Sequence, residues 1–520
     1  MARQKSEDRD KPQGRRKPVV TRRFESGAGG EAIPVEEEPK QLSLFAGTAE
    51  VLAQASVDGG VARSQERAAP RATPKPVVKG RQATVATIDA VTERLSEAFS
   101  NVEANRGAPG PDGRTLDVMR KHLGEWLPQL EVALQEGTYV PGEIRRVWIP
   151  KAGGGERGLG IPNVVDRVVQ ESVRLVLEPL YEPTFHASSH GFRPGRSCHT
   201  AIAEAVGYVD EGYAWVVDLD LEKFFDRVNH QRLMSKPTGR VSDKSVLVLI
   251  GRMLKAKVVL PDGVVVSNDE GVPQGGPLSP LLSNVVLDEL DRELERRGHR
   301  FVRYADDCNV YVRSERAGQR VMASLKQFIE RRLRLKVNEQ KSAVARPEER
   351  HFVGFRLRRE PLDGQVEVLL SKRSQERIGE RVRKLVPRNW GSSLDACILQ
   401  LNGYLRGWLG FFGICTAEQR TFHNLDAHIR RRLRAVQLRH WKRRRTVAKK
   451  LISLGITRRT AWRSVYEGRK STWAMSHASP VDRALRNSHW DARGLVSIER
   501  SWLAKQEKVV APVQLSLVLG

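Results

Sequence analysis

The feature that most constrains the fold is a pair of carboxylates set between two short apolar runs. Asp306 and Asp307 follow residues 301–304 and precede residues 309–312, and both runs are rich in aromatic and β-branched residues. This pattern predicts a β-hairpin that carries the two acids in its turn. Asp is also common in turns for structural reasons alone, so the dipeptide by itself does not indicate chemistry.

A second acidic run changes that interpretation. Residues 215–217 form an apolar, strand-like run that ends in Asp218 and Asp220. Magnesium in phosphate chemistry is usually held by one or two carboxylates plus substrate phosphates, and two-metal phosphoryl transfer places two ions about 4 Å apart. Carboxylates at the ends of neighbouring strands supply such ligands. Asp218 and Asp220 point to the same face of a strand, so periodicity leaves both open.

The net charge of the chain points to nucleic acid. Lys and Arg number 88 against 62 Asp and Glu in 520 residues, which gives a formal net charge of +26. A chain this basic favours a polyanionic partner, and its length allows several domains. No apolar run reaches the roughly 18 residues that span a bilayer, and the amino terminus lacks the apolar core of a signal peptide. No two of the four cysteines have CxxC spacing, so we expect a cytoplasmic protein without a zinc site.

Two motifs resemble those of reverse transcriptases. Tyr304-Ala305-Asp306-Asp307 resembles their YxDD box, and residues 220–226 resemble the first acidic motif of the same palm. In that motif an aromatic residue stands five positions after the metal-binding Asp, which selects Asp220, paired with Phe225, over Asp218. The resemblance implies that Asp220, Asp306 and Asp307 are catalytic and bind Mg²⁺, and that Asp218 is structural.

Further motifs follow in the order found in group II intron-encoded proteins. They are residues 106–113, 160–167, 190–197 (with His190 where Tyr is usual), 271–280 (with Val272 in place of Thr), 335–341 and 352–355. Together they resemble a bacterial group II intron-encoded reverse transcriptase and maturase over residues 86 to about 500. The resemblance implies an enzyme that copies intron RNA into DNA, helps the intron splice and supports its mobility. It also implies a bacterial, nucleoid-associated location.

The resemblance further implies an α/β right-hand polymerase followed by helical domains. The expected parts are a disordered extension (1–85), fingers and palm (86–365), an all-α thumb or X domain (366–448), a small helical DNA-binding domain (449–505) and a tail (506–520). No Cys or His follows His489. We therefore expect the type of relative that lacks an HNH endonuclease.

Four residues are candidates for binding the incoming deoxynucleoside triphosphate. Arg145 and Lys151 flank a strand that leads into a glycine-rich turn, where cations can neutralise phosphate oxygens. The resemblance places Phe225 beneath the sugar, where it would exclude a 2′-hydroxyl, and Gln274 against nucleotide or template. The structural alternatives are a basic surface hairpin, a core aromatic and an ordinary polar turn residue.

The carboxyl-terminal third carries arginine runs on helices that also have an apolar stripe. Leu401, Leu405 and Trp408 recur at helical spacing, which is typical of core packing. The resemblance makes the opposite, cationic face the surface for group II intron RNA and target DNA. The candidate contacts are Arg430, Arg431, Arg432, Lys442, Arg443 and Arg444. The alternative is a solvated charged face, and core packing is the default for Trp462, Trp473 and Trp490.

One apolar island interrupts the polar amino-terminal region. Gln41, Leu42, Leu44 and Phe45 belong to a QLSLF string that resembles the peptide with which bacterial polymerases dock on the sliding clamp. Apolar anchors on an extended arm suit such docking. A related string at residues 514–518 lacks the aromatic anchor. A chance apolar patch, or a strand packed on the protein itself, is the alternative.

Two other functions compete with an intron-encoded polymerase. One is a splicing factor whose polymerase core is inactive, which the intact acidic residues argue against. The other is a domesticated cellular reverse transcriptase with no intron around its gene. Flanking DNA that folds as a catalytic intron RNA would separate the last two.

Overall fold

A four-stranded antiparallel sheet lies at the centre of the polymerase-like part of the chain. The computed structural model describes residues 86–150, 155–467 and 471–507. The sheet runs in the order β6-β7-β3-β8, and every neighbouring pair is antiparallel. Its strands are β3 (Trp215–Leu219), β6 (Arg300–Tyr304), β7 (Asp307–Val312) and β8 (Ala343–Ala345).

The two faces of this sheet belong to two separate hydrophobic cores. Val217 and Val310 point into the core that holds α11 (Ser279–Arg296) and α12 (Glu315–Phe328). Their neighbours along the strands, such as Val216, point into the other core, which holds α7 (Cys198–Asp210) and the carboxyl-terminal helices. This division follows from the alternation of side chains along a strand, and it buries the sheet on both sides.

A second sheet takes two strands from before β3 and two from between β3 and β6. Its order is β2-β1-β4-β5, with β1 antiparallel to β2 and parallel to β4. The strands are β1 (Ile144–Pro150), β2 (Glu156–Ile161), β4 (Val258–Val259) and β5 (Val265–Val266). The helices of this part are α2 (Ile88–Glu93), α3 (Leu95–Ala104), α4 (Leu116–Lys121), α5 (Leu123–Gln135), α6 (Val164–Tyr181), α8 (Phe224–Arg227), α9 (His230–Thr238) and α10 (Lys244–Leu254), with short helical turns at Glu182–Thr184 and Ile329–Leu333.

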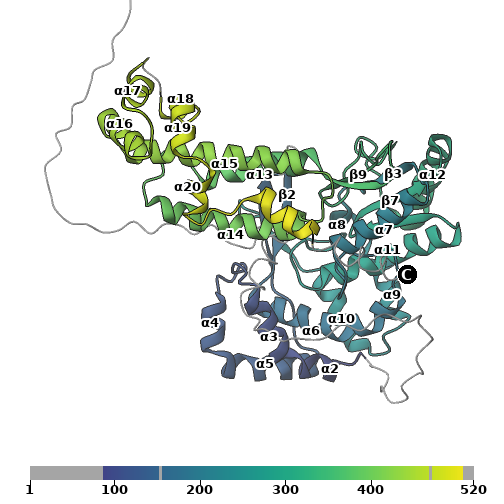
Figure 1. Cartoon of the computed structure of the whole chain (residues 1–520). Helices are drawn as coiled ribbons and strands as arrows, with labels where there is room; N and C mark the ends of the chain where they lie inside the picture. The colour runs from purple at the N-terminus through teal and green to yellow at the C-terminus, as the bar shows by residue number, and fades with distance from the viewer. Residues whose placement is uncertain (1–85, 151–154, 468–470, 508–520) are drawn as a thin grey trace, which may run out of the picture. The chain divides into compact units, whose positions relative to one another are not determined.

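The chain becomes all-helical after a last hairpin (Figure 1). Strands β9 (Phe355–Arg359) and β10 (Val366–Leu370) pair with each other. The expected boundary at residues 365/366 falls inside this hairpin; the domain boundaries as such stay a prediction. The helices that follow are α13 (Lys372–Leu385), α14 (Leu394–Phe412), α15 (Gln419–His440), α16 (Arg444–Ser453), α17 (Arg458–Tyr466), α18 (Thr472–Met475), α19 (Ser479–Ala484) and α20 (Asn487–Asp491).

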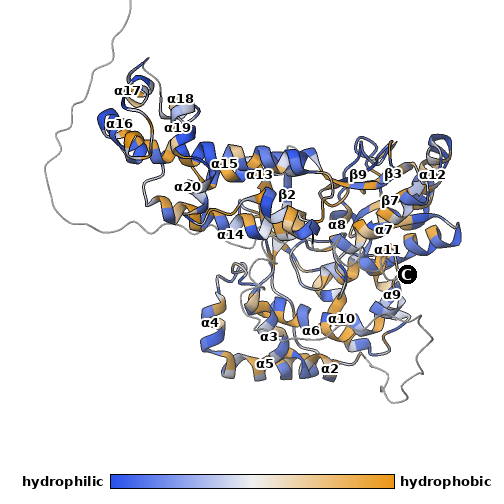
Figure 2. Ribbon diagram, in the orientation of Figure 1, coloured by the Kyte–Doolittle hydropathy of each residue, from blue (hydrophilic) through white to orange (hydrophobic). Residues whose placement is uncertain are grey.

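The long helices α14 and α15 carry apolar and charged residues on the same cylinder (Figure 2). Leu401, Leu405 and Trp408 are buried, so their expected role in core packing is confirmed. His199 Nε2 on α7 donates a hydrogen bond to the Phe411 carbonyl at 2.7 Å. The same core therefore joins the sheet β6-β7-β3-β8, which we call the palm sheet, to α14. Among the described residues, no helix combines the length and the apolar character needed to cross a membrane.

Candidate active site

The predicted acidic residues meet at one end of the palm sheet. Asp220 directly follows β3, and Asp307 is the first residue of β7. Leu219 pairs with Cys308, and this register brings the adjoining Asp220 and Asp307 to the same end of two neighbouring strands. Tyr304 pairs with Asp307 across the β6–β7 hairpin. Ala305 and Asp306 therefore form a tight turn, so the predicted hairpin is confirmed, but Asp307 lies at the start of β7 and not in the turn.

Carboxylates and cations act against one another at this end of the sheet. Burial raises the pKa of Asp306, Arg157 and Arg303 oppose that shift, and the neighbouring Asp220 adds to it. Desolvation, together with Asp306, Asp218 and Asp220, raises the pKa of Asp307 to about 8, although Asp307 is exposed to solvent. Lys341, whose Nζ lies 3.6 Å from Asp220 Oδ2, opposes the shift of Asp307. Ionised Asp220 and Asp306 therefore oppose ionisation of Asp307.

The donor set fits a magnesium ion that is completed by its substrate. Within the described part of the chain, no group of three or more Asp, Glu, His or Cys side chains already has a metal-binding arrangement. Magnesium commonly takes one or two carboxylates and fills its remaining positions with water and substrate phosphates. Asp220, Asp306 and Asp307 offer such carboxylates, and their mutual repulsion favours a bound cation.

Asp218 is engaged elsewhere. Its Oδ2 accepts hydrogen bonds from Arg350 Nε at 2.8 Å and forms an ion pair with Arg350 Nη2 at 2.6 Å. Burial raises the pKa of Asp218, and Arg350 opposes that shift. Arg350 thus occupies the Asp218 carboxylate, which leaves Asp220 as the candidate ligand from β3. This placement agrees with the structural role that the sequence suggested for Asp218.

A small cavity lies beside Phe225, near the acidic residues in sequence. It has a volume of about 70 Å³, and its lining includes Phe225, Arg146, Gly160 and Pro273. The Phe225 carbonyl accepts from Val272 N at 2.6 Å. The Pro-Gln-Gly turn is therefore joined to the segment that carries Phe225, and the cavity has one wall from β1 and β2 and one from α8.

Arg145 and Arg146, which are neighbours in β1, contact different parts of the protein. Arg145 Nη2 donates to the Pro109 carbonyl at 2.7 Å, in the glycine- and proline-rich loop of residues 106–113, which by its resemblance to the family motif is a candidate template loop. Arg146 lines the Phe225 cavity and lies 3.8 Å from Asp226. Sequence reasoning chose Arg145 for the nucleotide, but strand alternation places Arg146 at this cavity instead.

The other two candidate nucleotide contacts are less defined. The Gln274 carbonyl accepts from Gly160 N at 2.7 Å, so its backbone ties the turn to β2. Its proposed contact with nucleotide or template stays a prediction. Lys151 lies outside the described residues, as do the clamp-like residues Gln41, Leu42, Leu44 and Phe45.

The prediction of a nucleic-acid contact for Arg432 needs correction. Arg432 is buried, and its guanidinium donates to the carbonyls of Val386 and Arg383 at distances from 2.6 to 3.0 Å. These carbonyls lie at the end of α13, where the last turn of a helix leaves carbonyls without intrahelical partners. Arg432 therefore stabilises the end of α13, and its donors point into the protein.

Arg431 lies over an aromatic ring. Its guanidinium carbon is 4.2 Å from the ring centroid of Trp473, and those of Arg388 and Arg432 are 5.2 Å and 6.0 Å from the same ring. Trp473 is half-buried, so the core role expected for it is incomplete. Burial, followed by Arg432, Arg383 and Arg431, lowers the pKa of the nearby His428. Helix α15 and the segment after α13 thus gather cations around the indole of α18.

The remaining cationic candidates lie at the end of α15 and the start of α16. Lys442 and Arg443 are exposed in the short connection between the two helices, and Arg444 opens α16 in a half-buried position. Arg430 is half-buried one position before Arg431. Sequence reasoning missed Arg388, because it stands alone near the end of α13 and only the fold brings it to Trp473.

Comparisons with known proteins match both halves of this arrangement. Residues 149–357 match the family described as reverse transcriptase (RNA-dependent DNA polymerase), and residues 375–452 match the group II intron maturase-specific domain. Protein YkfC of Escherichia coli (strain K12) is 33% identical over 352 residues, which cover 59% of this chain and 88% of YkfC. The chain belongs to the reverse transcriptases that carry a group II intron maturase-specific domain.

This reverse transcriptase is also similar to an intron-encoded relative. The group II intron-encoded protein LtrA of Lactococcus lactis subsp. cremoris is 30% identical over 327 residues, covering 50% of this chain and 54% of LtrA. The chain thus spans about half of LtrA and most of YkfC. Family membership confirms the expected RNA-directed DNA polymerase and maturase classes.

Membership also locates the two sites within the reverse transcriptase. The three clustered carboxylates lie inside the segment matched by the polymerase family, as does the lining of the Phe225 cavity except for Ile144 and Arg146. Arg388, Arg431 and Arg432 lie inside the segment matched by the maturase domain, whereas Trp473 follows it. The cluster around the indole therefore combines the maturase-specific segment with the helices after it.

Proposed function

We propose that the reverse transcriptase extends a DNA primer on an RNA template by Mg²⁺-dependent phosphoryl transfer at Asp220, Asp306 and Asp307. The observation that carries this proposal is the meeting of these carboxylates at one sheet end, where burial and neighbouring carboxylates raise the pKa values of Asp306 and Asp307. Bound magnesium would activate the attacking oxygen and stabilise the leaving group. The chain itself contributes the carboxylates and the rigid strand ends that hold them.

The Phe225 cavity is the proposed place for the sugar of the incoming deoxynucleoside triphosphate. Phe225 is buried, with its ring 5.1 Å from that of Phe224 in an edge-to-face pair. A ring held on one side by Phe224 cannot easily withdraw, so an added 2′-hydroxyl would meet it. Arg146 in the cavity wall, and Arg145 beside the template loop, are the proposed cations for phosphates.

The helical carboxyl-terminal region is the proposed surface for group II intron RNA and target DNA. Arg388 and Arg431 place positive charge over the Trp473 ring. Arg432, Arg383 and Arg431 all add to the lowering of the pKa of His428, which indicates a local excess of positive charge. Positive charge that the protein leaves unbalanced favours a phosphate backbone, whose binding releases counterions. The proposed location with the bacterial nucleoid follows from these partners.

Primer extension with purified protein tests the polymerase proposal. The expected result is Mg²⁺-dependent DNA synthesis on an RNA template, and the Asp306→Asn variant should lose it. Asp117→Asn is the matched control, since Asp117 is an exposed acid on α4. Loss of synthesis in the control, or full synthesis by Asp306→Asn, would contradict the assignment of the site.

The sliding clamp remains a proposed partner through Gln41, Leu42, Leu44 and Phe45. Its support is the QLSLF string itself, which supplies apolar anchors for a groove. A peptide of residues 35–50 should bind purified bacterial clamp with micromolar affinity by calorimetry. Replacing Leu44 and Phe45 with Ala should remove that binding, while polymerase activity in the tube stays unchanged. A wild-type peptide that does not bind would end the proposal.

A further inference from the structure

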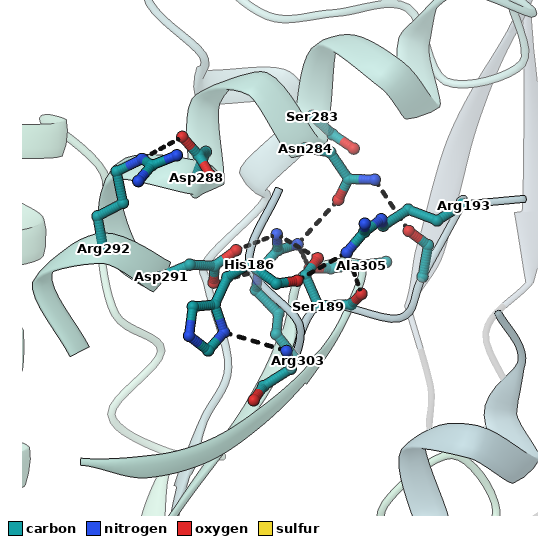
Figure 3. A network of polar contacts seen from close by, with 12 residues as sticks. His186, Ser189, Arg193, Ser283, Asn284, Asp288, Asp291, Arg292, Arg303 and Ala305 are labelled. Atoms are coloured by element: carbon teal, nitrogen blue, oxygen red, sulfur yellow. Dashed lines mark hydrogen bonds and ion pairs between the residues drawn. The ribbon is translucent and has the colours of Figure 1, made fainter. Parts of the chain in front are cut away.

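The buried guanidinium of Arg303 donates a hydrogen bond to Ala305, in the turn that carries Asp306 (Figure 3). Arg303 and its ion-pair partner Asp291 on α11 are both fully buried. A guanidinium has five N–H donors, and the structure gives Arg303 five acceptor contacts. They are Asp291 Oδ1 (2.7 Å), Asp291 Oδ2 (2.6 Å), Asn284 Oδ1 (2.9 Å), Ser189 Oγ (2.7 Å) and the Ala305 carbonyl (2.8 Å).

The contact with Ala305 is the one that reaches the active site. Ala305 directly precedes Asp306 and has a φ of 57°, in the left-handed region that a residue with a Cβ rarely adopts. Arg303 Nη1 donates to its carbonyl at 2.8 Å. The guanidinium therefore holds the one strained residue on which the direction of the Asp306 side chain depends.

A second segment closes on the same turn from the far side of β6. Ser189 forms a parallel bridge with Arg303, and His190 N donates to the Arg303 carbonyl at 2.8 Å. A Cβ added to Gly191 would lie 2.2 Å from Ala305 N, so only glycine allows this approach. Asn284 joins the two supports, because it donates to the Gly191 carbonyl at 2.9 Å and accepts from Arg303.

Stability alone does not require a buried ion pair here. Removing two charges from water is costly, and well-packed apolar residues of similar volume often replace such pairs without loss of stability. The ion pair contributes direction instead: Asp291 orients the guanidinium plane, and the plane orients the Ala305 carbonyl. A lysine could supply the charge but not five donors in a fixed plane.

We propose that Arg303 is a positioning residue of the polymerase reaction. Through the Ala305 carbonyl, Arg303 sets the positions of Asp306 and Asp307. Asp291 and Asn284 hold Arg303 in place, and the close approach of Gly191 holds the turn. The proposal rests on the proposed role of these aspartates as the metal-binding groups. The proposal adds that α11 and residues 188–191 position these aspartates, although neither segment contains them.

The double variant Arg303→Met, Asp291→Leu separates positioning from stability. No charge is left buried and unpaired, so the thermal midpoint should fall only through the three neutral acceptors that lose this donor, Asn284 Oδ1, Ser189 Oγ and the Ala305 carbonyl. The kcat for primer extension should fall by about 100-fold, the effect of a displacement near 1 Å, with the KM for primer–template unchanged. Affinity for Mn²⁺ in the primer–template complex, measured by electron paramagnetic resonance, should fall as well.

A second variant leaves the ion pair in place. Gly191→Ala pushes directly on Ala305 N and should likewise lower kcat and Mn²⁺ affinity. Gly207→Ala on α7 is the matched control, because an added Cβ there meets no atom within 4 Å. Its kcat and Mn²⁺ affinity should equal those of the wild type. This pair keeps the test valid if the double variant does not fold.

Two outcomes would separate the failure of this inference from the failure of the site assignment. Wild-type kcat and Mn²⁺ affinity in Gly191→Ala, or in a folded double variant, would overturn the positioning role. Synthesis by Asp306→Asn at the wild-type rate would overturn the role of the carboxylates themselves. A kcat that falls only in proportion to lost stability would also reject positioning, since a purely structural residue behaves in that way.

Discussion

The end of the palm sheet gathers negative charge, whereas α15 and the segment after α13 gather positive charge around Trp473. In the palm, Asp220 and Asp306 are half-buried and Asp307 is exposed, and desolvation with neighbouring carboxylates raises the pKa of Asp306 and Asp307. In the helical region, the exposed Arg388 and the half-buried Arg431 lie over a half-buried indole.

The difference in charge and in extent predicts a difference in ligand. A small cluster of carboxylates suits a compact divalent ion, and its support must be rigid because small displacements change ligand geometry. A broad cationic surface suits a long polyanion, since each phosphate contact contributes a similar, salt-sensitive amount. The palm should therefore be sensitive to single substitutions, whereas the helical surface should lose affinity in small steps.

The largest expected effect is on synthesis by Asp306→Asn. Loss of a charge-stabilising group at a reaction centre typically costs about 100-fold or more in rate. Affinity for RNA should stay within about 2-fold, because the polyanion is bound by many separate contacts. Single-turnover primer extension beside filter binding measures both. A parallel fall in RNA affinity would break the proposed separation of the two regions.

A smaller effect is expected at the sugar. Phe225→Val shortens the side chain in the cavity, and selection against ribonucleotides should weaken by about 10-fold, the lower range for a change in apolar pocket volume. Competition between ribo- and deoxyribonucleoside triphosphates gives the ratio directly. Phe224→Leu is a useful comparison, since Phe224 backs the ring without being part of the cavity lining. Unchanged selection in Phe225→Val would make Phe225 a packing residue.

A third prediction concerns the helical surface. The double variant Arg388→Ala, Arg431→Ala should reduce the log–log dependence of RNA affinity on salt by about 1.4 to 1.8, if each arginine meets one phosphate. Arg432→Ala is the contrast. Its donors serve Val386 and Arg383 carbonyls, so it should lower the thermal midpoint and leave the salt slope nearly unchanged. Equal slopes in all three proteins would return these residues to a solvated-face role.

The smallest effect is a pH dependence of stability in metal-free protein. The folded-state pKa of Asp307 is raised to about 8 from an ordinary value near 3.8. Folding therefore favours the protonated acid, and this contribution is lost as pH rises from about 4 to 8. Asp307→Asn should gain in thermal midpoint relative to wild type over that range, with no further gain above it. Calorimetry without metal tests this, and a constant difference across pH would contradict it.

Much of the catalytic region was readable from the sequence. The apolar runs around Asp306 and Asp307 did become a hairpin, with Asp306 in its turn and Asp307 at the start of β7, because β-forming runs separated by a short polar segment have few other ways to pair. The helical character after residue 370 and the core role of the Leu401 stripe followed from periodicity for the same local reason.

The choice between chemically equal neighbours depended on tertiary structure. Asp218 differs from Asp220 because Arg350, far along the chain, pairs with it. Arg432 differs from Arg431 because the end of α13 presents carbonyls that take up its donors, whereas Arg431 lies closer over the Trp473 ring, at 4.2 Å against 6.0 Å for Arg432. Such neighbours have the same residue type and lie in or beside the same helix or strand. Sequence spacing does not predict which long-range partner each one meets.

The sequence by itself determined the family, the acidic turn and the mixed and all-helical regions, since these depend on local pattern. Only the tertiary structure decided that Arg146 lies at the Phe225 cavity, that Arg388 joins Trp473 and that Arg303 lies beneath Ala305. The physical reason is that a buried polar side chain must find partners where the folded chain supplies them. For Arg303 these partners come from three segments, 188–189, 284–291 and the turn itself.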